Sequence, residues 1–267
     1  MRGLVGCTHS LPLALRTKVG MSNDGQIFPI ANIASPPDSI TIQEFFHNRL
    51  SASFNPKTKM RKYIAEFIGT FFLVLTVGCT VIPAAAGVIP ALAIGAVLMV
   101  MIFAGGHISG GHFNPAVTFA VFVRGKLEFK DVVPYWLAQI AAGIAAALVA
   151  MFLVGKSGTP IEITNVPAAF VAEFLFTFAL AYVVVNCATA KGTLDNSFYG
   201  LAIGFTVLAG IFAVGAMSGG AFNPAVAIGA AVMKIVNLSD IWIHIVAELA
   251  GGLLAGLTFK FLNPTDK

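Results

Sequence analysis

The chain has 267 residues, of which 57% are hydrophobic and only 10% are charged. Because soluble domains carry about 25% charged residues, this composition excludes an ordinary soluble protein and indicates an integral membrane protein. The net charge of +4 does not indicate a nucleic-acid partner, since the basic residues flank apolar segments and form no stripe.

Residues 1–59 contain Pro36 and Pro37, scattered Ser and Asn, and no apolar run long enough to cross a membrane. We interpret them as an N-terminal extension that is disordered or serves as a targeting segment, because the first 23 residues hold basic residues and no acid. A start assigned too far upstream is the alternative, since Met60 opens MRKYIAEFIGTFF, a basic pair before an apolar run.

From Met60 onward, six apolar segments are long enough to cross a membrane, which takes about 20 residues in a helix. They run approximately over residues 63–82, 89–106, 133–154, 168–189, 199–217 and 241–262. Two shorter apolar segments, 115–123 and 224–236, are too short to cross. The sequence therefore predicts an all-α membrane protein with six transmembrane helices and two re-entrant half-helices.

The distribution of basic residues predicts the orientation, because such residues are enriched in cytoplasmic loops. The basic residues expected on one side of the membrane are Arg61, Lys62, Arg124, Lys126, Lys130, Lys191, Lys260 and Lys267. Those expected on the other side are Lys156 and Lys234. Both termini are expected on the cytoplasmic side.

The chain contains an internal repeat. Residues 92–117 match residues 201–226 at a constant offset of 109, with 16 identities in 26 positions, and SGGHFNPAV at 109–117 returns as SGGAFNPAV. The channel-like domain, 60–267, therefore consists of repeat one, about 60–155, and repeat two, about 167–264. Because each copy has three spans, an odd number, the second copy enters the membrane from the opposite side.

The repeated Asn-Pro pairs predict the start of each half-helix, because Asn is a favoured N-cap and Pro suits the first helical position. Non-helical backbone before such a start is tolerated in a membrane only inside protein or along water. Two starts that meet at mid-membrane thus imply a water-lined path guarded by two partly positive helix ends. The backbone carbonyls expected to replace a solute's hydration belong to Gly111, His112, Phe113, Gly220, Ala221 and Phe222.

GHISGGHFNPAVT at residues 106–118, the second Asn-Pro-Ala at 223–225 and the Ala-Glu-Phe triplets at 65–67 and 172–174 resemble the aquaporins, the major intrinsic protein family of water and small-solute channels. The resemblance implies that Asn114 and Asn223 point their amides into a pore. It also implies that Glu66 and Glu173 brace the re-entrant loops through backbone N–H groups, although a carboxylate reaching water from a helix end is the alternative. The implied pore motifs are Asn114, Pro115, Ala116 and Asn223, Pro224, Ala225, and the implied assembly is a homotetramer in the bilayer.

One position departs from the family pattern. Most aquaporins have arginine directly after the second Asn-Pro-Ala, where this chain has Val226, as in some vacuolar-type plant members. The resemblance places the selectivity constriction at Ile94, Ile211, Gly220 and Val226, which would be wide, uncharged and apolar. Because Ala227 replaces the aspartate typical of glycerol facilitators, we expect a channel for water and small neutral solutes such as hydrogen peroxide, ammonia and urea.

No nucleophile with a base, no phosphate-binding loop and no paired catalytic carboxylates are evident, so the chain is not predicted to be an enzyme and needs no cofactor. No metal site is predicted either, because the three cysteines are isolated and His107 and His112 lack a third ligand. Two alternatives stay open. One is an ion-coupled secondary transporter, for which the intramembrane acids Glu66, Glu173 and Glu248 are the candidates, and the other is a non-conducting member of the same family.

Overall fold

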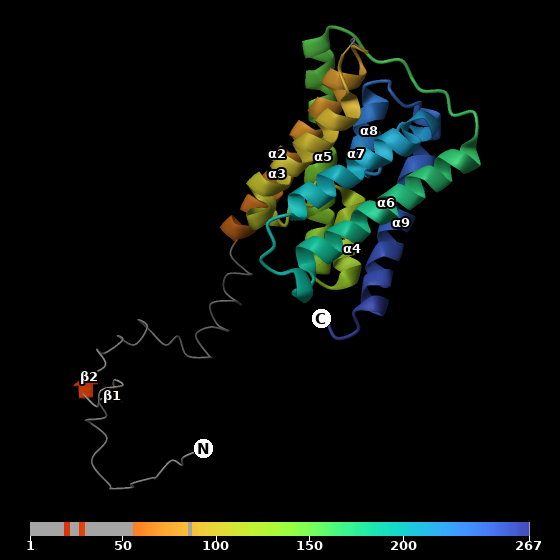
Figure 1. The fold of residues 1–267 in the computed structure, drawn as a ribbon. Helices are drawn as coiled ribbons and strands as arrows, with labels where there is room; N and C mark the ends of the chain where they lie inside the picture. The colour runs from red at the N-terminus through yellow and green to blue at the C-terminus, as the bar shows by residue number, and fades with distance from the viewer. Residues whose placement is uncertain (1–18, 22–26, 30–55, 85–86, 267) are drawn as a thin grey trace. The chain divides into compact units, whose positions relative to one another are not determined.

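The computed structural model describes residues 19–21, 27–29, 56–84 and 87–266 (Figure 1). The chain divides into two units, Met1–Ala52 and Ser53–Lys267. In the first unit, β1 (Val19–Met21) pairs antiparallel with β2 (Ile27–Pro29). The predicted extension at 1–59 falls largely outside the described residues and stays a prediction.

Every secondary-structure element described in the second unit is a helix. Its elements in chain order are α2 (Pro56–Val81), α3 (Pro90–Ser109), α4 (Pro115–Arg124), α5 (Phe129–Val154), α6 (Val166–Thr189), η1 (Lys191–Thr193), α7 (Tyr199–Ser218), α8 (Pro224–Val232), η2 (Leu238–Asp240) and α9 (Ile241–Leu262). In this described part of the chain, six helices are long and apolar enough to cross a membrane, namely α2, α3, α5, α6, α7 and α9. The 10-residue α4 and the 9-residue α8 are too short. The predicted fold class is thereby confirmed.

The two copies of the repeat meet where α3 packs against α7 (yellow and cyan in Figure 1). The backbones of the two helices are in contact at Gly95 and Gly204, which are related by the same offset of 109 residues. A methyl group added to Gly95 would lie 2.7 Å from the Gly204 carbonyl oxygen, and one added to Gly204 would collide with the Gly95 carbonyl. Glycine at both positions therefore allows backbone-to-backbone contact on the axis that relates the copies.

Each half-helix rests on a long helix from the other copy. α8 packs against α5, and α4 packs against α9. A side chain at Gly143 of α5 would lie 2.6 Å from the Ala225 carbonyl oxygen, and one at Gly252 of α9 would collide with the Ala116 carbonyl. This exchange ties the two copies together and fixes where the half-helices begin.

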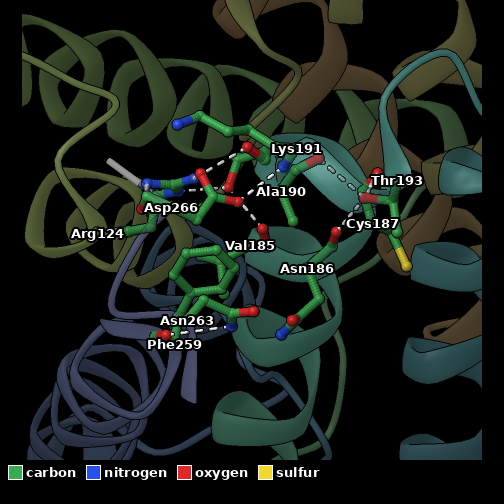
Figure 2. A network of polar contacts seen from close by, with 11 residues as sticks. Arg124, Val185, Asn186, Cys187, Ala190, Lys191, Thr193, Phe259, Asn263 and Asp266 are labelled. Carbon is green, nitrogen blue, oxygen red and sulfur yellow. Dashed lines mark hydrogen bonds and ion pairs between the residues drawn. The ribbon is translucent and has the colours of Figure 1, made fainter. Parts of the chain in front are cut away.

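The C-terminal end of the chain is bound to the end of α4 (Figure 2). Arg124 is only 3% exposed, and its guanidinium donates to a carboxylate oxygen of Asp266 at 2.8 Å and to the Thr189 backbone carbonyl at 3.0 Å. The second Asp266 oxygen accepts the Lys191 backbone N–H at 2.7 Å. This N–H and the guanidinium hold the pKa of Asp266 below its usual range.

Candidate functional site

Both half-helices begin at the Asn-Pro pairs predicted from the sequence. Asn114 and Asn223 have extended backbone, and a proline follows each as the first helical residue. The side-chain oxygen of Asn114 accepts the Ala116 N–H at 2.8 Å, and that of Asn223 accepts the Ala225 N–H at 3.0 Å. Each asparagine thus satisfies a backbone donor that a helix start leaves without an intrahelical partner.

The same two side chains also join the half-helices to each other. The amide nitrogen of Asn114 donates to the Phe222 backbone carbonyl at 2.8 Å, and that of Asn223 donates to the Phe113 carbonyl at 2.9 Å. Each asparagine therefore caps its own helix with its oxygen and bonds to the opposite loop with its nitrogen. The reciprocal pair fixes the two helix starts tip to tip.

The loops before the helix starts hold backbone conformations that bulky residues rarely adopt. Phe113 has φ of 48° and Phe222 has φ of 51°, and conformations of this kind cost on the order of 1–3 kcal/mol each unless the surroundings enforce them. Both phenylalanines are at most 1% exposed. Their rings occupy the space beside Gly69 and Gly210, where any larger residue would collide with them. Packing thus helps to hold the strained backbone.

Two buried glutamates bind these loops from behind. Glu66 of α2 and Glu173 of α6 are both 0% exposed, and each accepts two consecutive backbone N–H groups. The donors are His112 at 2.9 Å and Phe113 at 2.6 Å for Glu66, and Ala221 at 3.1 Å and Phe222 at 2.8 Å for Glu173. Turning these N–H groups toward the carboxylates removes them from hydrocarbon and fixes the direction of the loop.

A further set of polar side chains, which sequence reasoning missed as partners, supports the first loop. The Tyr135 hydroxyl donates to the Ser109 carbonyl at 2.7 Å, and the Gln139 amide donates to Glu66 at 2.8 Å and to the Thr118 hydroxyl at 2.9 Å. The offset of 109 was the available signal, because it relates Tyr135 to His244 and Gln139 to Glu248, all polar residues inside apolar helices.

A cavity of about 250 Å³ lies beside the paired helix starts. Asn114 and Asn223 line it, whereas the proline and alanine of each motif are buried and do not. All four residues predicted for the constriction also line it, as do Gly111, His112 and Ala221 from the predicted carbonyl set. Phe113 and Phe222 do not line the cavity, and their carbonyls accept the asparagine amides.

The cavity wall is mostly aliphatic, and no Asp, Glu, Lys or Arg of the described residues lines it. One imidazole does. The His112 Nδ1 lies 3.2 Å from the Thr118 hydroxyl, so this ring is engaged by its own half-helix. The site therefore offers asparagine amides, helix ends and the His112 ring within a mostly aliphatic wall, which suits a solute that is polar but uncharged.

The family model described as "Major intrinsic protein" matches residues 53–259. The chain belongs to the major intrinsic protein family. Among its relatives, the glycerol uptake facilitator protein-like 6 of Lactiplantibacillus plantarum is 38% identical over 217 residues, covering 78% of this chain and 100% of the relative. The probable aquaporin TIP2-2 of Oryza sativa subsp. japonica is 37% identical over 231 residues, covering 80% and 91%.

A solved structure agrees with this assignment at the level of the fold. The aquaglyceroporin of Plasmodium falciparum superposes with a TM-score of 0.68 at 20% sequence identity, covering 77% of this chain and 98% of that one. As a major intrinsic protein with six apolar helices in its described part, the chain is an integral, multi-pass membrane protein. Its family consists of passive channels for water and small solutes and not of enzymes.

Proposed function

We propose that this protein is a passive channel that conducts water and small uncharged solutes, such as hydrogen peroxide, ammonia and urea, and excludes ions and protons. The observation that supports it most is the reciprocal pair of hydrogen bonds between Asn114 and Phe222 and between Asn223 and Phe113. This pair brings two helix starts to the wall of one cavity.

Water passes because the centre of the path offers it donors. Each asparagine nitrogen carries two hydrogens, of which one is bound to the opposite carbonyl, so the second can meet a solute oxygen in the cavity. Gly111, His112 and Ala221 are proposed to supply backbone carbonyls along the path, which replace part of the hydration that a solute leaves behind.

Cations and protons are excluded by electrostatics. Each half-helix start carries roughly half a positive charge, and the starts of α4 and α8 face one another at the same point. No carboxylate among the described residues lines the cavity to offset them. A positive charge at the centre therefore meets two like partial charges and gains no counter-ion.

The constriction sets the range of solutes. Ile94, Ile211 and Val226 present aliphatic side chains, and Gly220 presents none. We therefore propose that the narrowest region holds no fixed charge and is wide enough for solutes larger than water. The relatives match this breadth, since they include proteins named as a glycerol uptake facilitator and as an aquaporin.

For the assembly we propose a homotetramer, with both termini on the cytoplasmic side. The excess of Lys and Arg flanking the corresponding ends of the spans supports this orientation. Exposed large side chains along the spans, such as Leu137, Phe152 and Phe212, fit contact with lipid or with neighbouring protomers.

Proteoliposomes test this function. Under an osmotic gradient, vesicles with the protein should shrink faster than protein-free vesicles, and under a urea gradient they should re-swell faster. An ionophore that collapses ion gradients should leave both rates unchanged. Solute flux that stops with the ionophore would instead indicate an ion-coupled transporter, and rates equal to those of protein-free vesicles would indicate a non-conducting protein.

A further inference from the structure

The two re-entrant loops are supported by side chains in matching positions but of different chemistry. In the first copy, Tyr135 donates to the Ser109 carbonyl and Gln139 donates to Glu66. In the second copy, His244 occupies the place of Tyr135, with its Nε2 2.9 Å from the Ser218 carbonyl. Glu248 occupies the position equivalent to Gln139, so the second copy has a carboxyl group where the first copy has an amide donor.

Glu248 lies in surroundings that do not suit a carboxylate. It is 0% exposed, and neither of its oxygens has a hydrogen-bond partner among the described residues. The polar groups that face it are the carboxyl of Glu173 and the backbone of Asn223. No Lys or Arg of the described residues forms an ion pair with either glutamate. Two facing buried carboxyl groups without a lysine or arginine partner cannot both be ionised at acceptable free energy, so one holds a proton.

The donors around Glu173 decide which of the two is ionised. Glu173 accepts the Ser218 hydroxyl at 2.6 Å in addition to the N–H groups of Ala221 and Phe222, and three such donors stabilise a negative charge. One oxygen, Oε2, accepts only the Phe222 N–H. The equivalent oxygen of Glu66 accepts both the Phe113 N–H and the Gln139 amide. Oε2 of Glu173 can therefore accept one more hydrogen bond, at the position where Glu66 accepts the Gln139 amide.

We propose that Glu248 is a neutral carboxylic acid whose O–H donates to Glu173, as the Gln139 amide does to Glu66, and that this bond positions the second re-entrant loop. Glu248 is therefore a positioning residue for Ala221, Phe222 and, through them, Asn223. The assignment concerns the bracing of the loop, and only its permeability readout rests on the proposed channel function.

The proposal predicts that the second re-entrant loop loses support at alkaline pH. Loss of the Glu248 proton would leave two facing anions and remove one donor from the second loop only. The described elements packed against α9 offer no free cation: α6 supplies Glu173 and, further along the helix, Tyr182 and Cys187, η2 supplies Asp240, α4 supplies only Arg124, already bound to Asp266, and α8 has no titratable side chain. On α9 itself, the His244 Nε2 lies 3.7 Å from Glu173 and 2.9 Å from the Ser218 carbonyl, and its buried Nδ1 has no partner among the described residues, so a second N–H there would be left unpaired.

Infrared spectroscopy of the purified full-length protein tests this proposal without any transport assay. At neutral pH, the carbonyl stretch of a protonated carboxylic acid should be present in the wild type, absent in Glu248→Gln, and retained in His244→Tyr, which copies the first repeat. The same band in Glu248→Gln as in the wild type would overturn the assignment. Failure of Glu248→Gln to fold would also contradict it, because an amide already performs this role at Gln139.

The reverse exchange, Gln139→Glu, is the matched variant. It should add a second protonated carboxyl band and make the first loop sensitive to alkali. In reconstituted vesicles, Glu248→Gln should keep its water permeability as the pH rises, while the wild type loses it and Gln139→Glu loses more. Parallel pH profiles for wild type and Glu248→Gln would refute the positioning role. A wild type that shows the carboxyl band but no water flux would refute the channel and leave the assignment of Glu248 standing.

Discussion

The Asn114 amide nitrogen lies 2.8 Å from the Phe222 carbonyl oxygen, although the two residues are 108 positions apart in the sequence. Its counterpart joins Asn223 to Phe113 at 2.9 Å. These bonds connect the two half-helices directly, and the Glu66 and Glu173 carboxylates hold the backbone that presents the two carbonyls. The proposed channel depends on this arrangement.

Replacing Asn223 with alanine should impair both the helix start and the contact between loops. The cap alone contributes about 1 kcal/mol, and the bond to Phe113 is lost as well. We expect lower thermal stability and lower osmotic water permeability in vesicles. Asn263→Ala is the control, because its amide bonds only to Phe259 one turn earlier, away from the cavity. Equal effects of the two substitutions would argue against a special role for Asn223.

Val226→Arg should narrow the range of solutes. The substitution places a fixed charge and up to five N–H donors at a cavity wall that also includes Ile94 and Ile211. Urea and hydrogen peroxide fluxes should fall more than water flux, measured in the same vesicles. Val226→Ile adds bulk without charge and serves as the control. If arginine lowers water and solute fluxes by the same factor, the residue does not act in selectivity.

Mercury should not block the channel. Neither of the described cysteines, Cys79 and Cys187, lines the cavity, and the wall position 220 is a glycine. Water flux should therefore resist mercuric chloride, and Val226→Cys, which puts a thiol in the cavity wall, should become sensitive. Strong inhibition that persists after removal of Cys79 and Cys187 would contradict the placement of this cavity on the water path. Cys7 lies outside the described residues.

Because Asp266 contacts Arg124 as a carboxylate, the stability of the protein should fall when the pH becomes acidic enough to protonate Asp266. Because the folded-state pKa of Asp266 is lowered, its contribution is present in full above the unfolded pKa, about 3.9, and is lost as the pH falls through the lower folded value. Asp266→Asn should therefore melt at a lower temperature than wild type at neutral pH. The gap in melting temperature should close in strong acid. A gap that is constant with pH would show that the charge of Asp266 is not involved.

The sequence predicts the helices and most of their ends because each signal there is local, although α2 begins at Pro56, seven residues before the predicted start, and α8 ends at Val232, four before the predicted end. Apolar length gave the six spans, and the Asn-Pro pairs gave the starts of α4 and α8 at Pro115 and Pro224. The inverted repeat placed these starts at one point of the fold. The length of the spans follows from the thickness of the hydrocarbon layer, the helix starts follow from capping, and the inversion follows from the odd number of spans in each copy.

The supporting contacts could not be predicted in the same way. A lone Gln139 in an apolar helix does not identify its partner Glu66, because that contact depends on how α5 packs against α2. Arg124 illustrates the same limit. The sequence identifies it only as a basic residue flanking a span, yet it is buried and bound to Asp266, 142 residues later. The positive φ of Phe113 and Phe222 is likewise set by tertiary contacts.

The paired helix starts are proposed to pass water and reject protons. Both fluxes can be measured in the same proteoliposomes, with light scattering for osmotic shrinkage and an enclosed pH-sensitive dye for proton entry. We predict fast shrinkage together with a proton leak equal to that of protein-free vesicles. Shrinkage no faster than in protein-free vesicles, or a proton leak that rises with water flux, would contradict the account.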